Sequence, residues 1–497
     1  MKHWKPNDRT VEAGLLGVGI FLVVGWLFHW GYLPPDDALR HAAYAVSDHT
    51  WNEILVLRSS MDTPAMDSHP GWHKTLRFLH GFGFSKERLV LFPTLLFSLT
   101  LLLLPLVFLR APWVWALTLV VLSSAQPNAF LRVFNGRPYW VTALTMGMML
   151  GGWQLLPSQS EKRRLLYVGV FLGTAAAVYV HSTWYLLSMP LLVCFSKSRF
   201  REWCQFSMVV CLGILAGAAL TGDGLHYLAF QLEHLYRALG SLRPGDYVVG
   251  EFRPLSWLNS LMGILGILAV LVYWKRKPEA RLNTPFLRMA VLGWLLSVLN
   301  GRFWYDWGFV AAAIALAQVI QQLFDDVWPI PSWIRRSAVV VGCVALIPLL
   351  TRSPWGRTWT DWSAEDHEAA LHRAQESSIS WMPEDHGIVY ATSMRVFFYW
   401  FYAFPEQSWK YAPGYEPGLL PDDDLRVFRQ WNASREDSLL FAWTSKLRLQ
   451  DRLVVWGEPE DPPPALPLEW QLIPPTYWVG RIPQPNLSEG LLQPAGE

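Results

Sequence analysis

Residues 89–109 read LVLFPTLLFSLTLLLLPLVFL, a run without a charged side chain. About 20 consecutive apolar residues are needed for a helix to cross the hydrocarbon core of a bilayer. Residues 258–274 form a second run of this kind, and neither run shows the apolar–polar alternation of a helix that faces water. The two runs therefore predict membrane-spanning helices.

The composition of the whole chain agrees with this prediction. Of its 497 residues, 52% are hydrophobic and only 16% are charged, whereas soluble domains carry roughly 25% charged residues. The net charge of +1 gives no basic patch that would favour a nucleic-acid partner. The first apolar run, residues 12–33, follows a short basic stretch but has no small-residue cleavage site, so we expect a retained helix.

Hydropathy predicts about 11 spans along residues 1–351. They lie near residues 12–33, 89–109, 112–127, 139–156, 165–180, 182–196, 206–222, 258–274, 286–300, 305–323 and 337–351. If the N-terminus is cytoplasmic, every predicted inner loop carries basic residues, as the positive-inside rule requires. The loop at residues 34–88 and everything after residue 351 then lie outside. The predicted fold class is mainly α: a polytopic transmembrane helical bundle.

The last part of the chain, residues 352–497, has no run of membrane length and mixes short apolar segments with acidic and proline-rich ones. Residues 387–392 and 453–457 are typical of short buried strands, and Ser393 suits the cap of a helix over residues 394–403. We therefore expect two domains. Residues 1–351 form the bundle with its first outer loop, 34–88, and residues 352–497 form an extracytoplasmic α/β domain.

Several classes of protein are excluded by missing motifs. The four cysteines lie in or beside predicted spans, and the sequence has no CxxC or HExxH pattern for zinc. It also has no Gly-rich Walker loop, which argues against a nucleotide-driven pump. A cofactor-free enzyme or a carrier remains.

The first outer loop holds the strongest chemical signal. Asp36 and Asp37 directly follow the first span, and the same loop continues with Asp67, His69 and Lys74. A carboxylate beside apolar helices becomes a better base near neutral pH, and cationic side chains bind phosphate. A base with a phosphate clamp suits sugar transfer from a polyprenyl-phosphate donor. The plainer alternative is that adjacent aspartates only solvate or cap a helix end.

Two further segments on the predicted outer side repeat one pattern, an Asn-Gly-Arg sequence followed by aromatic residues. They place Arg137 and Arg302 at outer helix starts, where each guanidinium suits the oxygens of a donor phosphate. Ordinary turn and interface anchors have the same composition. We expect Asp306 to pair with Arg302 one helical turn earlier, and His181 to be a packed or water-facing histidine.

The acidic pair after the first span, with Asp67-x-His69-Pro70 and Lys74, resembles the protein O-mannosyltransferase branch of the type-C membrane glycosyltransferases. The layout is also similar to that of the lipid A aminoarabinose transferases. Gly71 stands where the family motif has a second proline, and the middle domain of the mannosyltransferases is missing.

This resemblance implies an inverting glycosyltransferase with a polyprenyl-phosphate sugar donor and an extracytoplasmic acceptor, either lipid, glycan or protein. Asp36 would be the general base and Asp37 its assistant. Lys74, Arg137 and Arg302 would hold the donor phosphate, while Asp67 and His69 would position the loop or the acceptor. No cofactor and no metal are expected: the acidic residues offer ligands for a divalent cation, but the similar families are metal-independent. The expected location is a bacterial inner membrane, with the N-terminus cytoplasmic and the C-terminal domain periplasmic.

The rival from another class is a transporter or flippase for a lipid-linked or anionic solute. Such a protein needs ionisable residues inside its helices, whereas the charges here are predicted at helix ends. A glycan polymerase or ligase is a third reading. Asp36→Asn separates these classes, because a glycosyltransferase should lose transfer while a carrier has no need of that carboxylate.

Overall fold

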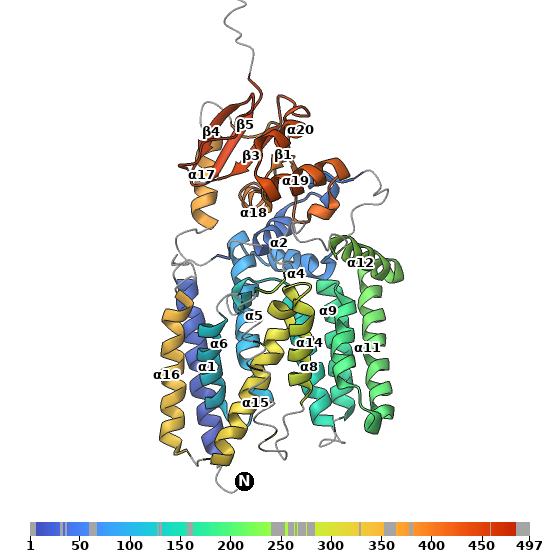
Figure 1. Ribbon diagram of the computed structural model, residues 1–497, viewed down its shortest axis with the longest axis vertical. Coiled ribbons are helices and arrows are strands. Elements are labelled where there is room, and N and C mark those ends of the chain that lie inside the picture. The colour runs from blue at the N-terminus through green and yellow to red at the C-terminus, as the bar shows by residue number, and fades with distance from the viewer. Residues whose placement is uncertain are drawn as a thin grey trace, which may run out of the picture. The chain divides into compact units, whose positions relative to one another are not determined.

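The computed structural model describes residues 6–29, 33–34, 37–58, 67–126, 129, 132–156, 163–239, 254–256, 263, 266, 275, 284–327, 330–351, 364–376, 381–457 and 459–483. The chain divides into two compact units (Figure 1). Unit 1 comprises Met1–Pro34, Asp67–Leu242 and Val249–Ser363. Unit 2 comprises Pro35–Met66, Arg243–Val248 and Ala364–Glu497.

The described part of unit 1 is helical. Its α-helices are α1 (Pro6–His29), α4 (Pro70–Gly81), α5 (Lys86–Leu103), α6 (Pro112–Ala125), α8 (Tyr139–Leu155), α9 (Arg163–His181), α10 (Ser188–Cys194), α11 (Phe200–Thr221), α12 (Gly224–Leu239), α14 (Pro285–Ser297), α15 (Phe309–Val327) and α16 (Ser332–Thr351). Short 3-10 turns stand at Leu104–Val107, Arg132–Phe134, Trp184–Leu187 and Lys197–Arg199, and a π-helical turn spans Phe303–Gly308.

Five helices among the described residues are long and apolar enough to cross a bilayer, and they indicate a membrane protein. They are Asp8–Trp26, Lys86–Val107, Arg163–His181, Lys197–Thr221 and Phe303–Phe324. The expected number of about 11 is not confirmed. Three other apolar helices are shorter: Pro112–Ala125, Trp184–Cys194 and Pro285–Ser297. The predicted span at residues 258–274 lies outside the described residues except for Gly263 and Gly266.

Helices α9 and α11 pack in parallel through a Gly-x-x-x-Gly pair. A Cβ added to Gly213 would lie 2.9 Å from the Phe171 carbonyl oxygen, and one added to Gly217 would lie 2.5 Å from that of Ala175. Glycines at this spacing let two helix backbones approach closely. From the first contact to the second, the residue number rises by four on both helices, so the two helices run in the same direction. Their C-terminal ends therefore lie at the same end of unit 1.

Charged side chains join α1 to α16. The Asp8 carboxylate lies 3.2 Å from Arg335 Nη2 and 2.9 Å from Arg336 Nη2, and the buried Glu12 carboxylate lies 3.0 Å from Arg335 Nε. Removing a carboxylate from water costs free energy, and the nearby guanidinium groups offset that desolvation cost for Asp8 and Glu12.

Unit 2 is an α/β assembly. Its α-helices are α2 (Asp37–Val46), α3 (Trp51–Ile54), α17 (Ala364–Glu376), α18 (Met394–Ala403), α19 (Asp422–Ser434) and α20 (Phe441–Thr444), and its strands are β1 (Ile388–Ala391), β2 (Lys410–Ala412), β3 (Arg452–Trp456), β4 (Glu469–Ile473) and β5 (Tyr477–Arg481). The sheet has the order β2-β1-β3-β5-β4. Strand β1 pairs in parallel with β2 and β3, whereas β5 is antiparallel to β3 and β4.

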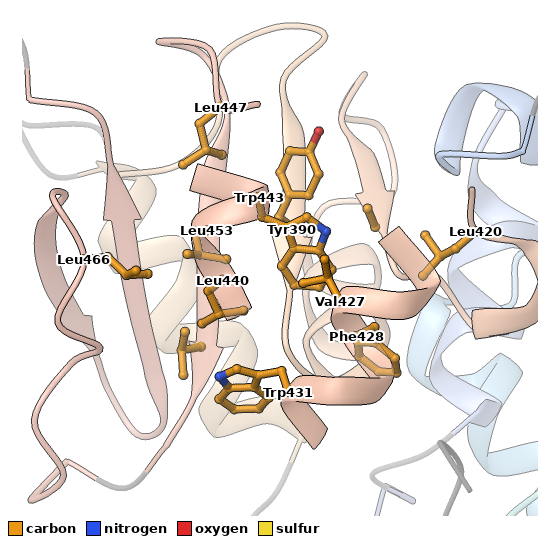
Figure 2. Packing of buried hydrophobic residues seen from close by; sticks show 12 residues of the cluster. Tyr390, Leu420, Val427, Phe428, Trp431, Leu440, Trp443, Leu447, Leu453 and Leu466 are labelled. Carbon is orange, nitrogen blue, oxygen red and sulfur yellow. The ribbon is translucent and has the colours of Figure 1, made fainter. Parts of the chain in front are cut away.

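The predicted strands at 387–392 and 453–457 are confirmed as β1 and β3, and the predicted helix at 394–403 is α18. The Ser393 side chain caps that helix by accepting a hydrogen bond from Arg395 N. One face of the sheet packs against α19 and α20, where Tyr390, Trp431, Trp443 and Leu453 form the core (Figure 2).

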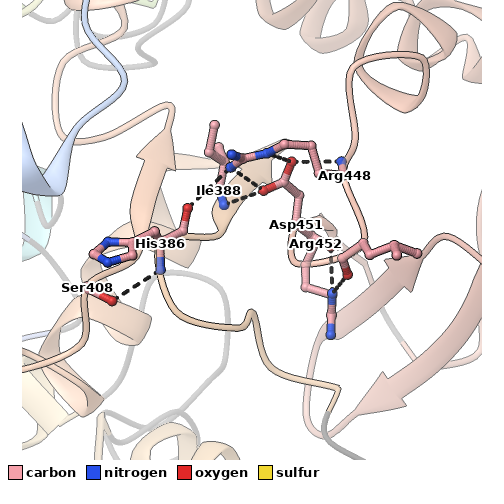
Figure 3. A network of polar contacts seen from close by, with 7 residues as sticks. His386, Ile388, Ser408, Arg448, Asp451 and Arg452 are labelled. Atoms are coloured by element: carbon pink, nitrogen blue, oxygen red, sulfur yellow. Dashed lines mark hydrogen bonds and ion pairs between the residues drawn. The ribbon is translucent and has the colours of Figure 1, made fainter.

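Asp451 ties the amino end of β1 to the turn before β3. Its buried carboxylate accepts hydrogen bonds from Ile388 N at 2.8 Å and from Arg448 Nη2 at 2.9 Å (Figure 3). Arg448 Nη2 also donates to the carbonyl oxygen of His386. These bonds fix the register at which the two central strands meet.

The first outer-loop segment belongs to unit 2. Helix α2 packs against α18, and Leu55 forms a parallel bridge with Tyr411 of β2. Val56 N donates to the Tyr411 carbonyl oxygen at 3.1 Å. The sequence analysis grouped all of residues 34–88 with residues 1–351. Pro35–Met66 instead belongs to unit 2, which also holds the C-terminal residues, and α2 buries its apolar face against α18 of that unit.

Candidate functional site

Asp67 and His73 form a carboxylate–imidazole pair where α4 begins. The Asp67 carboxylate accepts a hydrogen bond from His69 N at 2.9 Å, which sets up the turn into Pro70 and the helix. Its second oxygen lies 2.5 Å from Nδ1 of the buried His73. Because an ionised carboxylate can only accept hydrogen bonds, Nδ1 is the donor in this pair, which makes Nε2 the acceptor nitrogen of the neutral ring.

Two more histidines lie beside this pair. The ring centroid of His69 lies 6.2 Å from that of His73 and 5.6 Å from that of His181. His181 ends α9 and is buried, and the hydroxyls of Thr142 and Thr183 each lie 2.8 Å from its Nδ1. The expectation that His181 is a packed histidine is confirmed, but its neighbours are themselves candidate site residues.

The chain turns sharply directly after His181. Ser182 has φ +48°, in the left-handed region that only glycine occupies without strain. This turn ends α9 at His181 and leads into the 3-10 turn Trp184–Leu187. Strained backbone of this kind persists where its surroundings hold it, often beside functional residues.

Close packing fixes α4 on α9. A Cβ on Gly71 would meet the Tyr179 ring at 2.3 Å, so a larger side chain at this position would displace that ring. The Tyr227 hydroxyl of α12 lies 3.3 Å from the carbonyl oxygens of both Ser68 and Val178. Lys74 places its ammonium 5.7 Å from the Tyr179 ring centroid.

A second cluster surrounds the fully buried Asp306. One carboxylate oxygen lies 2.7 Å from Arg132 Nε and 2.6 Å from Arg132 Nη2, and the other lies 2.9 Å from Arg302 Nε. The predicted pair of Asp306 with Arg302 is therefore confirmed. Asp306 stands in the π-helical turn Phe303–Gly308, a rare geometry that is frequent at functional sites. Two guanidinium groups thus contact one buried carboxylate.

Tyr139 connects the two clusters within unit 1. Its hydroxyl donates to the Arg132 carbonyl oxygen at 2.9 Å, and the Arg132 guanidinium lies 5.3 Å from its ring centroid. The same ring lies 6.3 Å from that of His181. Side-chain contacts thus run without a break from Asp67 through the histidines and Tyr139 to Arg302.

Arg137 lies in the turn that leads into α8. Gly136 has φ +62° and approaches the Thr94 side chain so closely that a Cβ would lie 2.2 Å from its hydroxyl oxygen. Gly136 thus has the left-handed backbone of a turn, as in the plainer alternative given for this Asn-Gly segment. From this segment it is Arg132 that reaches Asp306, and Arg132 had no signal in the sequence that set it apart from other arginines.

The acidic pair lies in unit 2. Asp36 is outside the described residues. Asp37 is the first residue of α2, and its carboxylate contacts Arg40 through both oxygens and His41 Nε2 at 3.3 Å. The Arg40 guanidinium lies 4.0 Å from the Tyr415 ring centroid. Within unit 2, Asp37 is thus held by two neighbours on its own helix, while Asp67, His69, Lys74, Arg137 and Arg302 belong to unit 1.

Among the described residues, no group of three His, Cys, Asp or Glu side chains is arranged to hold a metal ion. Comparison with known proteins finds no matching family model and no similar curated protein. The chemistry of the site therefore rests on its own geometry.

Proposed function

We propose that this chain is an inverting membrane glycosyltransferase that moves a sugar from a polyprenyl-phosphate donor to an extracytoplasmic acceptor. The observation that carries the proposal is the unbroken contact path from the Asp67–His73 pair to the arginines around Asp306. The path supports the proposal because it connects a proton acceptor with a cationic cluster, the two elements that this reaction requires.

In the proposed reaction, the base takes the proton of the acceptor hydroxyl as its oxygen attacks the anomeric carbon. The bond from that carbon to the phosphate oxygen breaks, and the polyprenyl phosphate leaves as an anion. Arg132 and Arg302 would stabilise the charge on this leaving group, with Lys74 and Arg137 as further cations of unit 1. Attack opposite the leaving group inverts the anomeric configuration.

Two assignments of the base predict different inactive variants. The resemblance assigns the base to Asp36, with Asp37 assisting. The geometry of unit 1 supports His73 as the base, oriented by Asp67 at its Nδ1, with His69 placed to position the acceptor. The proposal further locates the chain in a bacterial inner membrane, with a cytoplasmic N-terminus and unit 2 in the periplasm.

One observation favours a carrier as the second candidate. Asp306 is fully buried in the first turn of a helix of membrane length, and buried ionisable residues in spans often mark the path of an ion or solute. In that reading, Arg132 and Arg302 would bind an anionic or lipid-linked solute during its passage and no bond to the sugar would break.

The deciding experiment follows the release of polyprenyl phosphate from a panel of labelled polyprenyl-phosphate sugars, with the full chain in liposomes. General-base catalysis contributes about 10²–10⁴ in rate. One of the two variants, Asp36→Asn or Asp67→Asn, should therefore release polyprenyl phosphate at least about 100-fold more slowly than the wild type, while it still binds the donor. Asp423→Asn, an exposed carboxylate of unit 2, is the matched control. If donor crosses the bilayer without release of polyprenyl phosphate, the chain is a carrier. If both aspartate variants release polyprenyl phosphate at the wild-type rate, both assignments of the base are wrong.

A further inference from the structure

Helix α12 exposes an apolar face. Leu225, Ala229, Leu232 and Tyr236 are all exposed, with Leu225 at 71% and Tyr236 at 77%. Their spacing places them on one side of the helix. Tyr227 and Gln231 on the opposite side are buried. An amphipathic helix of a water-soluble protein has the reverse arrangement, because its apolar stripe faces the core.

Helix α4 shows the same feature at its C-terminal end. Phe78 and Phe82 are 65% and 70% exposed, and their ring centroids lie 4.7 Å apart. The other side of α4 is buried against unit 1 through Trp72, His73 and Leu76. Two large aromatic side chains in contact on an exposed surface form an apolar patch rather than isolated residues.

The two helices lie at the same end of unit 1. The Tyr227 hydroxyl of α12 bonds the Ser68 carbonyl oxygen just before α4. Helix α12 follows the end of α11 after two residues, and α11 ends at the same end as α9, whose last residue His181 contacts His69. Figure 1 shows α4 and α12 lying across the ends of the long helices of unit 1.

Both exposed faces continue the apolar surfaces of helices of membrane length. Along α11 the exposed side chains are Met208, Leu212, Leu215 and Leu220, and Leu225 follows directly. Along α5, Phe92 is exposed, and its ring centroid lies 5.8 Å from that of Phe84, two residues after Phe82. Exposed apolar side chains along the spans are therefore followed by exposed apolar side chains on α12 and α4.

We propose that α4 and α12 lie in the interfacial layer of the bilayer, with Phe78, Phe82, Leu225, Leu232 and Tyr236 turned into the acyl chains. The partner of this surface is the lipid bilayer itself. Lys74 and Arg77 are exposed on the same helix as Phe78, and cationic side chains beside an interfacial apolar face bind lipid phosphates. This proposal does not depend on the proposed enzymatic activity.

Single cysteines carrying a nitroxide label test the proposal in full-length protein reconstituted into phosphatidylcholine–phosphatidylglycerol vesicles. The exposed native Cys204 and Cys211 are first replaced by serine. The test positions are Phe78, Leu225, Leu232 and Tyr236, and the matched controls are the exposed polar residues His226 and Glu233 of α12. We expect the test labels to collide several-fold more often with oxygen than with a water-soluble nickel chelate, and the two controls to show the opposite ratio.

Two results would overturn the proposal. Equal access of the nickel chelate to all six labels would mean that this face lies in water, and spin–spin broadening between identical labels would mean that a second copy covers it. A measurement on the unsubstituted chain guards against misfolded variants. A lipid with a photoreactive group in its acyl chain should cross-link to the peptides that contain residues 78–82 and 225–236. If neither peptide carried the cross-linked lipid, the interfacial placement of α4 and α12 would be wrong.

Discussion

Replacement of Asp306 by alanine tests whether Arg132 and Arg302 form an anion-binding site. The carboxylate is fully buried and contacts both guanidinium groups at 2.6–2.9 Å. Loss of one member of a buried ion cluster costs about 3–5 kcal/mol, because the remaining charges are left uncompensated. The side chains of Arg132 and Arg302 are 12% and 23% exposed, so water screens part of this charge. We therefore expect Asp306→Ala to lower the free energy of unfolding by about 3 kcal/mol, the lower end of this range.

An anion that occupies the vacated position should restore part of that stability. If phosphate binds with a Kd of about 1 mM, then about 10 mM phosphate contributes RT ln 11, roughly 1.4 kcal/mol. The assay is the unfolding midpoint of the purified full chain, with and without phosphate at constant ionic strength. Asp8→Ala is the matched control, because Asp8 also bridges two arginines, Arg335 and Arg336, in another part of unit 1.

The expected result is recovery by phosphate in Asp306→Ala and not in Asp8→Ala. Equal recovery in both variants would show a general salt effect and refute an anion site at Arg132 and Arg302. An Asp306→Ala variant as stable as the wild type would refute the energetic reasoning itself.

Two further predictions concern stability. Gly217→Ala should lower the free energy of unfolding by about 1–3 kcal/mol, because the added Cβ overpacks against the Ala175 carbonyl. Gly169→Ala is the control: its Cβ would meet no atom within 4 Å, so its effect on stability should be neutral or favourable. Equal shifts of the denaturation midpoint in both variants would contradict the close α9–α11 contact. In unit 2, burial lowers the pKa of His367 from 6.5 to about 4. Between these values the unfolded chain takes up a proton that folded His367 does not, so stability should fall as pH falls from 6.5 to 4, by roughly 3 kcal/mol in all. His367→Gln should flatten this dependence and His372→Gln, an exposed histidine of the same helix, should not; the same slope in all three proteins would contradict the assignment.

The parts of the fold that could be predicted from sequence are those that local chemistry decides. Ser393 caps α18 through its own side chain, and β1 and β3 are short apolar runs whose burial follows from their composition. The Asp306–Arg302 pair was also predictable, because four residues separate partners on one helical turn.

The rest depends on contacts between distant segments. Arg132 reaches Asp306 across 174 residues, and the rings of Tyr139, His181 and His69 meet only because three separate segments pack together. Hydropathy also could not set span lengths. The predicted span at 182–196 is an 11-residue apolar helix, because the backbone reverses at Ser182 before it begins.

The packing of α2 against α18 has a consequence for the order of events during synthesis. Roughly 350 residues separate α2 from α18 in the chain, and at about 5–20 residues per second a ribosome needs roughly 20–70 seconds to make them. Throughout that interval the apolar face of α2 and the edge position of Leu55 have no native partner. Unit 2 is therefore completed last, after the segments of unit 1 have been translated. A chain cut short anywhere before residue 394 leaves residues 37–58 as exposed apolar surface, which is the surface that quality-control proteases and chaperones recognise.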